Sequence, residues 1–385
     1  MSEEGVSKGG RRGGGGRPHH NTHPQQSSAE ATMAARRRRR EREEEAVALA
    51  KKFYEATVRR GVRGLALEFR ELRSYVPPLA TMEAFQKNAN RNRYRDVLCM
   101  DDTRVRLEDG DNDYIHASVV RGSRRLNQYI CTQAPLDSTV IHFWQMAWEQ
   151  RTRLIVMLCR TFEGKLRKCA DYWPQEEGDE GAMVVGNYRV VKTRPSQREF
   201  LDQPHHVLTV NRLALTCTAS KETRQVVQAI WETWPDKGVP STRRAIIKLR
   251  QKVLAFDRLA GVGSPIVIHC SAGIGRTGTV VLLDLCIGHL EMGRTDLIVA
   301  EETRRLRNQR MHSVQTDHQY IYVHAALLDY IANRWLLPLR LLDDKGEERR
   351  RRFMNDFENY IRTGTLQPAA AAPGAAPRQQ QQQQQ

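Results

Sequence analysis

Hydrophobic positions in the first folded part of the chain recur at helical spacing. From Glu43 to about residue 58 the apolar side chains that share one helix face are Val47, Ala50, Phe53, Tyr54 and Val58. A second helical pattern covers about residues 65–72, and it stops at Pro77 and Pro78 because proline cannot continue a helix. The folded region is therefore predicted to begin with two helices.

The middle of the chain changes to short apolar runs separated by turn residues. The region from 113–118 through 132–136 is predicted to form strands, 142–148 an amphipathic helix and 154–158 a buried strand. Residues 184–233 partly alternate polar and apolar positions, which predicts antiparallel strands, for example over 207–217. A closing helix is expected over about 316–334.

The stretch 264–290 reads as a buried strand, a tight loop and a buried helix. Residues 266–268 are β-branched, and the residues after 279 are apolar almost all round the expected helix, which begins near Thr277. Between strand and helix, the loop 271–276 contains Gly273 and Gly275. Such a loop can turn its N–H groups inward at a helix N-terminus, where they bind an anion such as phosphate.

Cys270 stands at the edge of this predicted anion site. The inward N–H groups, the helix dipole and the guanidinium of Arg276 all favour its thiolate form, which is the nucleophilic form. Arg276 can also hold two phosphate oxygens with its planar fork. The alternative, a cysteine that is only a small buried hydrophobic residue, fits the remaining cysteines better. These are Cys99, Cys131, Cys159, Cys169, Cys217 and Cys286.

Five segments, including the loop just described, support a family resemblance. The string HCSAGIGRTG at 269–278 resembles the phosphate-binding loop of the protein tyrosine phosphatases. The NRYRDV segment at 92–97 resembles their phosphotyrosine-recognition loop, and the WPDKGVP segment at 234–240 their mobile acid loop. Glu163 and Lys168 lie in a matching segment that ends in Tyr-Trp-Pro, and residues 306–320 match the family's last motif. The resemblance covers about residues 60–335, in family order.

The resemblance implies a single α/β domain with a highly twisted mixed β-sheet flanked by helices. It also implies two-step hydrolysis of phosphotyrosine in proteins, without a metal or other cofactor. Cys270 attacks phosphorus while Asp236 protonates the leaving phenolate, which gives a phosphocysteine. Closure of the acid loop would desolvate Asp236 and raise its pKa. Gln315 then places a water molecule, for which Asp236 is the base, and Thr277 helps the thiolate leave.

The family motifs also imply a set of binding and supporting residues. Tyr94 forms an aromatic wall whose depth selects phosphotyrosine over the shorter phosphoserine, and Asp96 grips the peptide backbone. His269, Glu163 and Lys168 support the site. The other phosphate-loop and substrate-binding positions are Ser271, Ala272, Gly273, Ile274, Gly275, Arg276 and Gln319. Two positions depart from the family pattern, because His116 stands where Asn is usual and Ala134 where Gly is usual.

The domain organisation follows from composition. Residues 1–45 contain few apolar residues and are expected to be a disordered basic tail. Residues 46–335 are expected to form the phosphatase domain. Residues 336–385 are expected to be a charged, Ala/Pro- and Gln-rich tail with a short charged helix at 349–352. The run Arg36 to Arg40 could act as a nuclear import signal or contact acidic lipid, although a solvated charge run is the simpler reading. His19, His20 and His23 could bind a metal ion, but no Cys or carboxylate stands at ligand spacing, so we interpret them as part of the solvated tail.

Charge and cysteine usage bear on the surroundings of the protein. The net charge is +16, of which residues 1–45 and 334–385 carry +3 each, so the excess is spread along the chain. This favours general anion attraction through basic tails over specific nucleic-acid binding. The cysteines have no paired spacing and the chain has no long apolar run, which predicts an intracellular protein without a membrane span. Together with the family resemblance, this predicts a cytoplasmic, monomeric, non-receptor enzyme. The sequences of its motifs are similar to those of the set expanded in nematodes.

Three other functions remain open at the level of sequence. The chain could be an inactive phosphotyrosine-binding module, although Cys270, Arg276, Asp236 and Gln315 are all present. It could act chiefly through its tails as a nucleic-acid-associated protein. A lipid phosphatase is the third alternative, and Tyr94 disfavours it.

Overall fold

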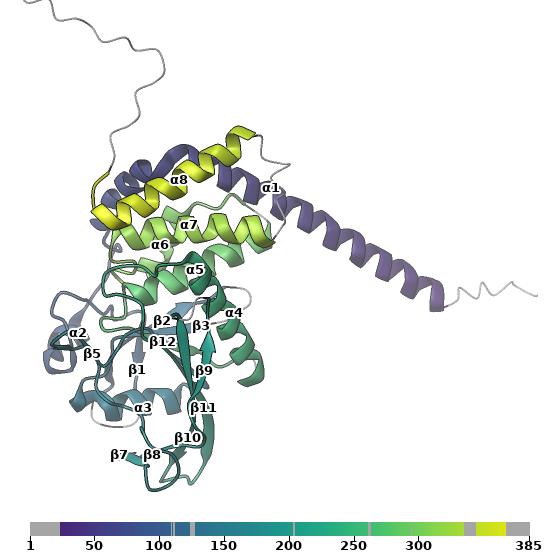
Figure 1. Cartoon of the computed structure of the whole chain (residues 1–385). Helices are drawn as coiled ribbons and strands as arrows, with labels where there is room; N and C mark the ends of the chain where they lie inside the picture. Colours follow the sequence, from purple (N-terminus) through teal and green to yellow (C-terminus); the bar gives the residue numbers. More distant parts are fainter. Residues whose placement is uncertain are drawn as a thin grey trace, which may run out of the picture. The chain divides into compact units, whose positions relative to one another are not determined.

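The structure is a computed structural model that describes residues 24–108, 110, 112–123, 128–202, 205–260, 263–293, 295–334 and 344–366. The chain divides into two units, residues 1–44 and residues 45–385. In the first unit the described residues belong to helix α1 (Pro24–Arg73), which continues into the second unit. The second unit contains all the other described elements (Figure 1).

A mixed β-sheet forms the centre of the second unit. Its strands follow the order β1-β2-β3-β12-β4-β11-β10-β8-β7, and β9 pairs with β10. The pairs β3/β12, β12/β4 and β4/β11 are parallel, whereas the outer pairs are antiparallel. The strands are β1 (Arg104–Arg106), β2 (Tyr114–Arg121), β3 (Gln128–Thr132), β4 (Leu154–Met157), β7 (Met183–Val185), β8 (Tyr188–Lys192), β9 (Gln197–Phe200), β10 (Val207–Cys217), β11 (Thr223–Trp231) and β12 (Ile266–His269).

Strand β12 has a parallel neighbour on each side, and all four of its residues are buried. Its β-branched residues suit this position because a parallel strand covered on both faces needs apolar side chains in succession. Val267 pairs with Ile130 of β3 and with Ile155 of β4. The strand predicted at 266–268 is therefore confirmed, and it delivers Cys270 to the carboxyl end of the sheet.

Helices cover the sheet, as the fold-class prediction required. Helix α5 contacts β12 and β3, α4 contacts β4, and α3 contacts β2, β7 and β8. Figure 1 shows α3 and α4 on opposite sides of the strands. The helices after α1 are α2 (Glu83–Lys87), α3 (Val140–Glu149), α4 (Arg243–Ala260), α5 (Arg276–Met292), α6 (Val299–Arg307), α7 (Asp317–Arg334) and α8 (Asp344–Thr363). None of the described helices has the length and apolarity that a bilayer crossing requires.

Helix α1 agrees with one expectation and differs from another. The two helices predicted before Pro77 are confirmed, because α1 is broken at Gly61, whose φ of 66° and ψ of 172° are not helical. Residues 24–45, expected to be disordered, are helical in the structure. Residues of the arginine run are exposed there, and Arg37 and Arg40 form ion pairs with Glu41 and Glu44, one turn further on. Such i,i+4 pairs stabilise a helix that has little to bury. The remaining part of the predicted tail, residues 1–23, lies outside the described residues.

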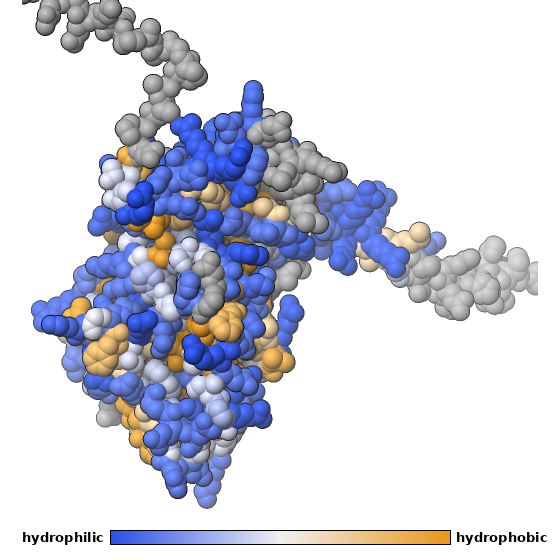
Figure 2. Space-filling view, in the orientation of Figure 1, coloured by the Kyte–Doolittle hydropathy of each residue, from blue (hydrophilic) through white to orange (hydrophobic). Residues whose placement is uncertain are grey.

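Helix α8 corrects the predicted C-terminal boundary at residue 335. The charged helix expected at 349–352 is longer, and its apolar side chains Phe353, Met354, Phe357 and Tyr360 are buried in the core. Their spacing is that of one helix face, but the adjacent arginines masked it in the sequence. Figure 2 shows a largely hydrophilic outer surface over α8. The folded unit therefore extends to at least Thr363, while residues 367–385 lie outside the described residues.

Candidate active site

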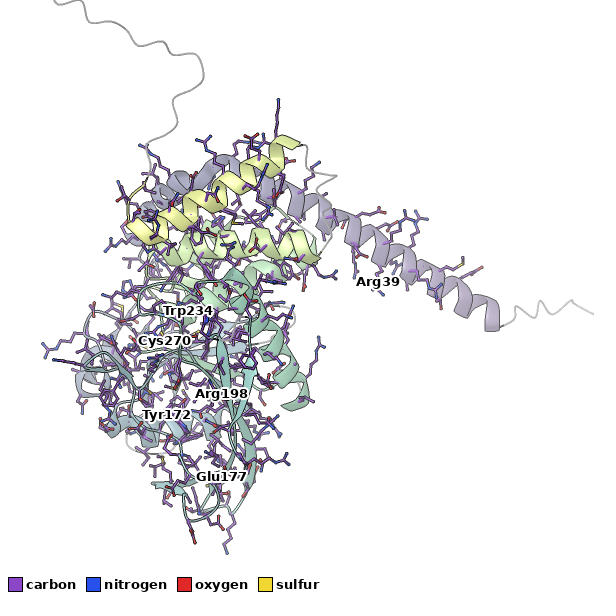
Figure 3. All side chains as sticks on the ribbon, viewed as in Figure 1. Arg39, Tyr172, Glu177, Arg198, Trp234 and Cys270 are labelled. Carbon is purple, nitrogen blue, oxygen red and sulfur yellow. The ribbon has the colours of Figure 1, made fainter. Side chains whose placement is uncertain are left out.

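The loop between β12 and α5 surrounds Cys270, which is buried at the end of the strand (Figure 3). The backbone N–H of Gly273 donates a hydrogen bond to Cys270 Sγ at 3.2 Å. Gly273 has a φ of 71°, and a Cβ atom at this position would lie 2.0 Å from the carbonyl oxygen of Thr132. Only glycine fits both conditions. The loop is thus bent so that at least one amide points at the sulfur.

Arg310 holds the outer side of this loop. Its guanidinium is fully buried and donates to the carbonyl oxygens of Gly273 (3.2 Å) and Ala272 (3.1 Å). The C=O and N–H groups of a peptide unit point in opposite directions. Carbonyls fixed toward Arg310 therefore leave the amides on the other side available to an anion. Arg310 was not among the predicted site residues, although it lies in the last matching motif.

His116 completes the support of Arg310. Arg310 Nη2 lies 3.1 Å from His116 Nδ1, and His116 Nε2 lies 2.8 Å from the carbonyl oxygen of Val97. Burial, and secondarily the charge of Arg310, lowers the pKa of His116 to about 3. The ring is therefore neutral, with its proton on Nε2 and an acceptor at Nδ1. One donor and one acceptor are also what an Asn side chain offers, which explains how histidine fits this position.

Arg276, the first residue of α5, is buried beside Cys270 and forms a two-pronged ion pair with Glu163 on the hairpin β5 (Phe162–Glu163) and β6 (Leu166–Arg167). Nη2 donates to Glu163 Oε2 at 2.9 Å, and Nη1 also donates to the carbonyl oxygen of Trp234 at 3.0 Å. Burial lowers the pKa of Arg276, but the hydrogen bonds to Glu163 and the nearby Cys270, Cys159 and Glu163 side chains together outweigh burial and raise the pKa. Arg276 therefore stays charged, with its fork already oriented.

Asp236 lies in the acid loop and contacts two cations. Lys168 Nζ donates to its Oδ2 at 2.8 Å, and Arg276 Nη2 donates to its Oδ1 at 3.1 Å. Burial raises the pKa of Asp236, but the hydrogen bond from Lys168 and the charges of both cations outweigh burial and lower it. The rise in the pKa of Asp236 expected from closure of the acid loop over a substrate stays a prediction, and its two cationic neighbours were not evident from the sequence.

The predicted aromatic wall contacts the phosphate loop directly. The hydroxyl of Tyr94 lies 2.8 Å from Ser271 Oγ, and Ser271 Oγ donates to the carbonyl oxygen of Lys168 at 3.0 Å. Tyr94 is half-buried, whereas Asp96 is exposed and has no hydrogen-bond partner among the described residues. The recognition loop, the phosphate loop and the segment after β6 thus meet around Ser271.

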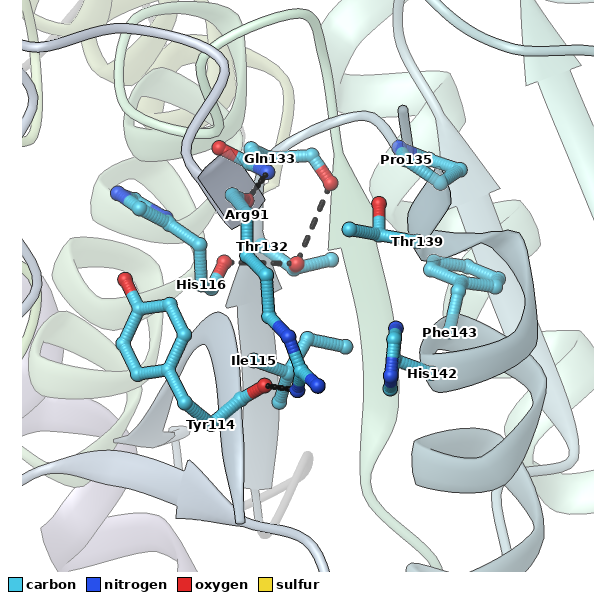
Figure 4. A pocket seen from close by; sticks show the side chains of 10 residues that line it. All are labelled: Arg91, Tyr114, Ile115, His116, Thr132, Gln133, Pro135, Thr139, His142 and Phe143. Carbon is cyan, nitrogen blue, oxygen red and sulfur yellow. Dashed lines mark hydrogen bonds between the residues drawn. The ribbon is translucent and has the colours of Figure 1, made fainter. Parts of the chain in front are cut away.

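A small pocket beneath the recognition loop shows how that loop is attached to the sheet (Figure 4). Arg91 Nη1 donates to the carbonyl oxygen of Tyr114 on β2 at 2.7 Å. Gln133 Nε2 donates to the carbonyl oxygen of Arg91 at 2.8 Å, and its Oε1 accepts the N–H of Arg93 at 2.9 Å. The side-chain amide of Gln133 therefore binds two points of the loop at once, and it fixes the backbone on both sides of Asn92.

Two glutamines near the start of α7 contact the opposite side of the site. Gln319 is fully buried, and its Oε1 accepts the N–H of Gln315 at 3.0 Å while its Nε2 donates to the carbonyl oxygen of Gly238 at 3.4 Å. A Cβ atom on Gly275 would lie 3.0 Å from Gln315 Oε1. Both side chains therefore lie against the phosphate loop, and Gln319 also links it to the acid loop.

Two further buried polar side chains belong to the site, one directly before Cys270 and one in the first turn of α5. His269 Nε2 lies 2.8 Å from the hydroxyl of Tyr172, and burial lowers the pKa of His269 to about 4, so the ring is neutral. Tyr172 was not among the predicted site residues. Thr277 is fully buried, and its Oγ1 has no hydrogen-bond partner in the part of the chain that the structure describes. Ile274 is also buried, and its carbonyl oxygen accepts the N–H of Val314 at 2.9 Å.

The site therefore brings together the residues that the sequence predicted from five separate segments. It consists of a buried cysteine that accepts a hydrogen bond from a backbone amide, a fixed guanidinium, an acid loop that contacts this guanidinium, and an aromatic side chain at the edge. Such an arrangement can bind a tetrahedral dianion beside a nucleophile and an acid. The described residues contain no group of three or more His, Cys, Asp or Glu side chains that could hold a metal ion.

Comparison with known proteins agrees with this geometry. The sequence model of the protein-tyrosine phosphatase family matches residues 88–329, which is more than half of the chain. The chain belongs to the protein-tyrosine phosphatase family, and the family recognition from its motifs is confirmed.

Its relatives include non-receptor members of this family. The chain is 36% identical over 282 residues to human tyrosine-protein phosphatase non-receptor type 2, an alignment that covers 73% of this chain and 65% of the relative. It is 36% identical over 300 residues to rat tyrosine-protein phosphatase non-receptor type 9, covering 72% and 48% respectively. Human receptor-type tyrosine-protein phosphatase C is 40% identical over 248 residues, covering 63% and 18%. The chain thus spans between about half and two thirds of the length of these two non-receptor relatives.

Proposed function

We propose that this protein hydrolyses phosphotyrosine in proteins through a phosphocysteine intermediate. The observation that carries the proposal is the contact of one guanidinium with the acid loop beside the cysteine. Arg276 donates to Asp236 at 3.1 Å, and Arg276 and Cys270 belong to the same buried loop, whose Gly273 amide donates to the sulfur. Nucleophile, anion binder and acid are thus assembled in one place, as covalent phosphoryl transfer requires.

In the first step the thiolate of Cys270 attacks phosphorus and the bond to the phenolic oxygen breaks. Asp236 gives its proton to the departing phenolate, so the products are a free tyrosine side chain and a cysteinyl phosphate. Arg276 and the loop amides from Ser271 to Gly275 bind the equatorial oxygens throughout. Because the carbonyls of Ala272 and Gly273 are held by Arg310, these amides need little reorganisation, and preorganised donors are the most effective stabilisers of developing charge.

In the second step water attacks the cysteinyl phosphate and the S–P bond breaks. Asp236, now a carboxylate, accepts a proton from the water, and Gln315 orients that water from its position against Gly275. The departing sulfur needs a hydrogen-bond donor, and the buried, unpartnered hydroxyl of Thr277 suits that role. His269 is neutral and supports the carbonyl of Cys270, at 3.2 Å from its Nδ1.

Selectivity for phosphotyrosine is proposed to rest on Tyr94 and Asp96. Tyr94 is fixed to the phosphate loop through Ser271, so it can stack on the phenyl ring of a substrate, a contact worth on the order of 1 kcal/mol. A phosphoserine side chain lacks this ring and is too short to reach the bottom of the site. The exposed carboxylate of Asp96 is free to accept N–H groups of a bound peptide.

The experiment is turnover of a phosphotyrosyl peptide and of p-nitrophenyl phosphate by the full chain and by Cys270→Ser. We expect the variant to lose turnover and to keep phosphopeptide binding, because a serine hydroxyl is not ionised in the site. A matched Cys286→Ser variant, which changes a buried cysteine of α5, should keep activity. Residual activity of Cys270→Ser above about one per cent of the unmodified protein would contradict the nucleophile assignment.

The main rival is a module that binds phosphotyrosine without turnover. Its discriminating result is tight phosphopeptide binding by the unmodified chain with no release of phosphate. A lipid phosphatase would instead release phosphate from phosphoinositide vesicles faster than from peptides. The presence of Cys270, Arg276, Asp236 and Gln315 in one site favours turnover, and Tyr94 favours the peptide substrate.

The surroundings of the protein are also proposals. We infer that it acts in the cytoplasm as a monomer, with phosphotyrosine-containing proteins as its substrates and with basic tails that attract acidic partners. The run Arg36 to Arg40, exposed on α1, could direct it to the nucleus. Arg37 and Arg40 of this run pair with Glu41 and Glu44, whereas Arg36, Arg38 and Arg39 have no ion pair among the described residues and are open to a receptor. Substitution of these three arginines, followed by imaging of the tagged protein, tests this.

A further inference from the structure

A second pocket, of about 550 Å³, lies between helices α1 and α8, and it shares no lining residue with the candidate active site. Its size is within the range of ligand-binding cavities. Every lining residue belongs to the second unit of the chain. Its lining includes Arg59, Arg63, Leu67, Arg352 and Phe353.

The break in helix α1 forms one wall of this pocket. Gly61 has a φ of 66°, and a Cβ atom at this position would have no neighbour within 4 Å. Every residue from Val58 to Gly64 lines this space, although successive side chains of a continuous helix point about 100° apart around its axis. The break therefore shapes a concave surface where a straight helix would present a convex one.

The edge of the pocket is strongly basic. Five arginines line it, at positions 59, 60, 63, 349 and 352, and Asp356 is the only lining carboxylate. Arg60 forms an ion pair with Glu68. Arg59, Arg63 and Arg352 are exposed, and within the described part of the chain none of them has an ion pair or hydrogen bond through its side chain. Uncompensated positive charges so close together attract an anion.

The floor of the pocket is apolar. Phe353 and Tyr360 of α8 and Val62 of α1 are buried beneath it, and Leu67 is 46% exposed at its side. A purely phosphate-binding site would not need this apolar surface, because burying it against a polyphosphate yields no hydrophobic gain. The combination fits a ligand that carries several carboxylates and at least one apolar side chain.

We propose that this pocket binds an acidic peptide segment of a partner protein. The carboxylates of the segment pair with Arg59, Arg63 and Arg352, and an aliphatic or aromatic side chain of the segment packs between Leu67 and Phe353. Arginine forms bidentate pairs with carboxylates and is enriched at such interfaces. This inference does not depend on the proposed catalytic function, because the pocket and the active site have no residue in common.

The test measures binding of a short fluorescent peptide in which Glu and Asp alternate with Leu and Phe, with no phosphotyrosine. Orthovanadate blocks the active site of the full chain during fluorescence anisotropy. We expect saturable binding that weakens as ionic strength rises. The double variant Arg63→Glu, Arg352→Glu should bind at least about tenfold more weakly, a loss of about 1.4 kcal/mol. Leu67→Ala should weaken binding about threefold, because it removes the apolar contact but no charge.

Charge-matched controls separate this pocket from general attraction. Arg244→Glu with Arg38→Glu makes the same change in net charge at exposed positions elsewhere, one on α4 and one in the N-terminal arginine run, and should leave the dissociation constant within twofold. A peptide with Gln and Asn in place of the acids should not bind. Equal losses in the two double variants would overturn the proposal. So would binding of inositol hexakisphosphate at the pocket without binding of the peptide, since it would indicate a polyphosphate ligand.

Discussion

Arg276 Nη2 donates a hydrogen bond to Oδ1 of Asp236 at 3.1 Å, so the proposed phosphate-binding residue holds the proposed acid. Lys168 holds the other carboxylate oxygen at 2.8 Å. A bound phosphate would draw the N–H groups of Arg276 to itself and add negative charge next to Asp236. Both changes raise the pKa of Asp236 from its lowered value, so substrate binding itself would prepare the acid for proton donation.

Replacement of Lys168 by methionine should move the pH profile of kcat/KM. The hydrogen bond and charge of Lys168 lower the pKa of Asp236, so their loss should raise that pKa. Asp236 must be protonated to act as an acid, and kcat/KM therefore falls as pH rises above its pKa. The alkaline limb should move to higher pH by about one unit in Lys168→Met.

The control for this profile is Lys165→Met. Lys165 is exposed close by in the sequence and has no ion pair among the described residues. Its substitution therefore removes the same charge without removing a contact to Asp236. Its profile should match that of the unmodified enzyme. An unshifted alkaline limb in Lys168→Met would show that Lys168 does not set the ionisation of Asp236.

Asp236→Ala should slow poor leaving groups far more than good ones. A phenyl phosphate releases a basic phenolate that needs a proton in the transition state, whereas p-nitrophenolate is stable without one. We expect a loss of about 10²- to 10⁴-fold for phenyl phosphate and a much smaller loss for p-nitrophenyl phosphate in steady-state kinetics. Equal losses for the two substrates would argue that Asp236 acts only by positioning.

The sequence predicted the site residues that stand in recognisable motifs, and it missed supporting residues whose roles depend on tertiary contacts. Cys270, Gly273 and Arg276 belong to one short segment, and their chemical roles can be inferred from the sequence alone. The roles of Arg310, His116 and Tyr172 arise only when the segment after α6, strand β2 and the segment after β6 pack around that loop.

Helix α8 shows the same limit in the fold. The charged run of four arginines that begins at Arg349 suggested a solvated tail, and the apolar face that starts at Phe353 becomes evident only against a partner surface. The lowered pKa of Asp236 could not be predicted from the sequence for an equivalent reason. Its cationic neighbour Lys168 is 68 positions away in the sequence.

Truncation of Phe353 should therefore destabilise the whole domain. Phe353 is buried in the main core, and removal of a buried phenylalanine side chain typically costs about 3 to 5 kcal/mol. Urea unfolding should show that loss for Phe353→Ala and almost none for Arg351→Ala, which alters an exposed position of the same helix. If both variants unfold at the urea concentration of the unmodified protein, α8 does not belong to the cooperative unit.

The buried histidines should make the protein sensitive to acid. Burial lowers the pKa of His116 to about 3 and of His269 to about 4, whereas both would titrate near 6.5 in the unfolded chain. Between these values the unfolded state binds more protons than the folded state, so the free energy of unfolding falls as pH falls below about 6.5. Each histidine should cost about 1 kcal/mol between pH 7.5 and 5.5.

His116→Asn provides the check on that acid sensitivity. Asparagine can still donate to Val97 and accept from Arg310, but it has no proton to gain in this pH range. Its activity at neutral pH should be retained, and its loss of stability between pH 7.5 and 5.5, measured by urea unfolding, should be smaller by about 1 kcal/mol. An unchanged loss would mean that His116 titrates normally in the folded protein.

Oxidation by peroxide should select Cys270 among the cysteines. Burial raises the pKa of Cys131 and Cys169 to about 12, and that of Cys159 and Cys286 well above its usual range, so these side chains remain unreactive thiols. Cys270 instead accepts the Gly273 amide and lies beside Arg276, which favours a thiolate. Peroxide would convert that thiolate to a sulfenic acid with release of hydroxide.

The structure also indicates how this sulfenic acid would be protected. The amide nitrogen of Ser271 follows Cys270 directly and can displace the sulfenic hydroxyl, forming an S–N bond and water. Activity should therefore fall with mild peroxide, recover with excess thiol, and be preserved when vanadate occupies the site. Mass spectrometry should find Cys270 modified first, with the loss of mass that cyclisation requires. Modification of Cys159 or Cys286 while Cys270 stays a free thiol would contradict the thiolate assignment on which the proposed mechanism depends.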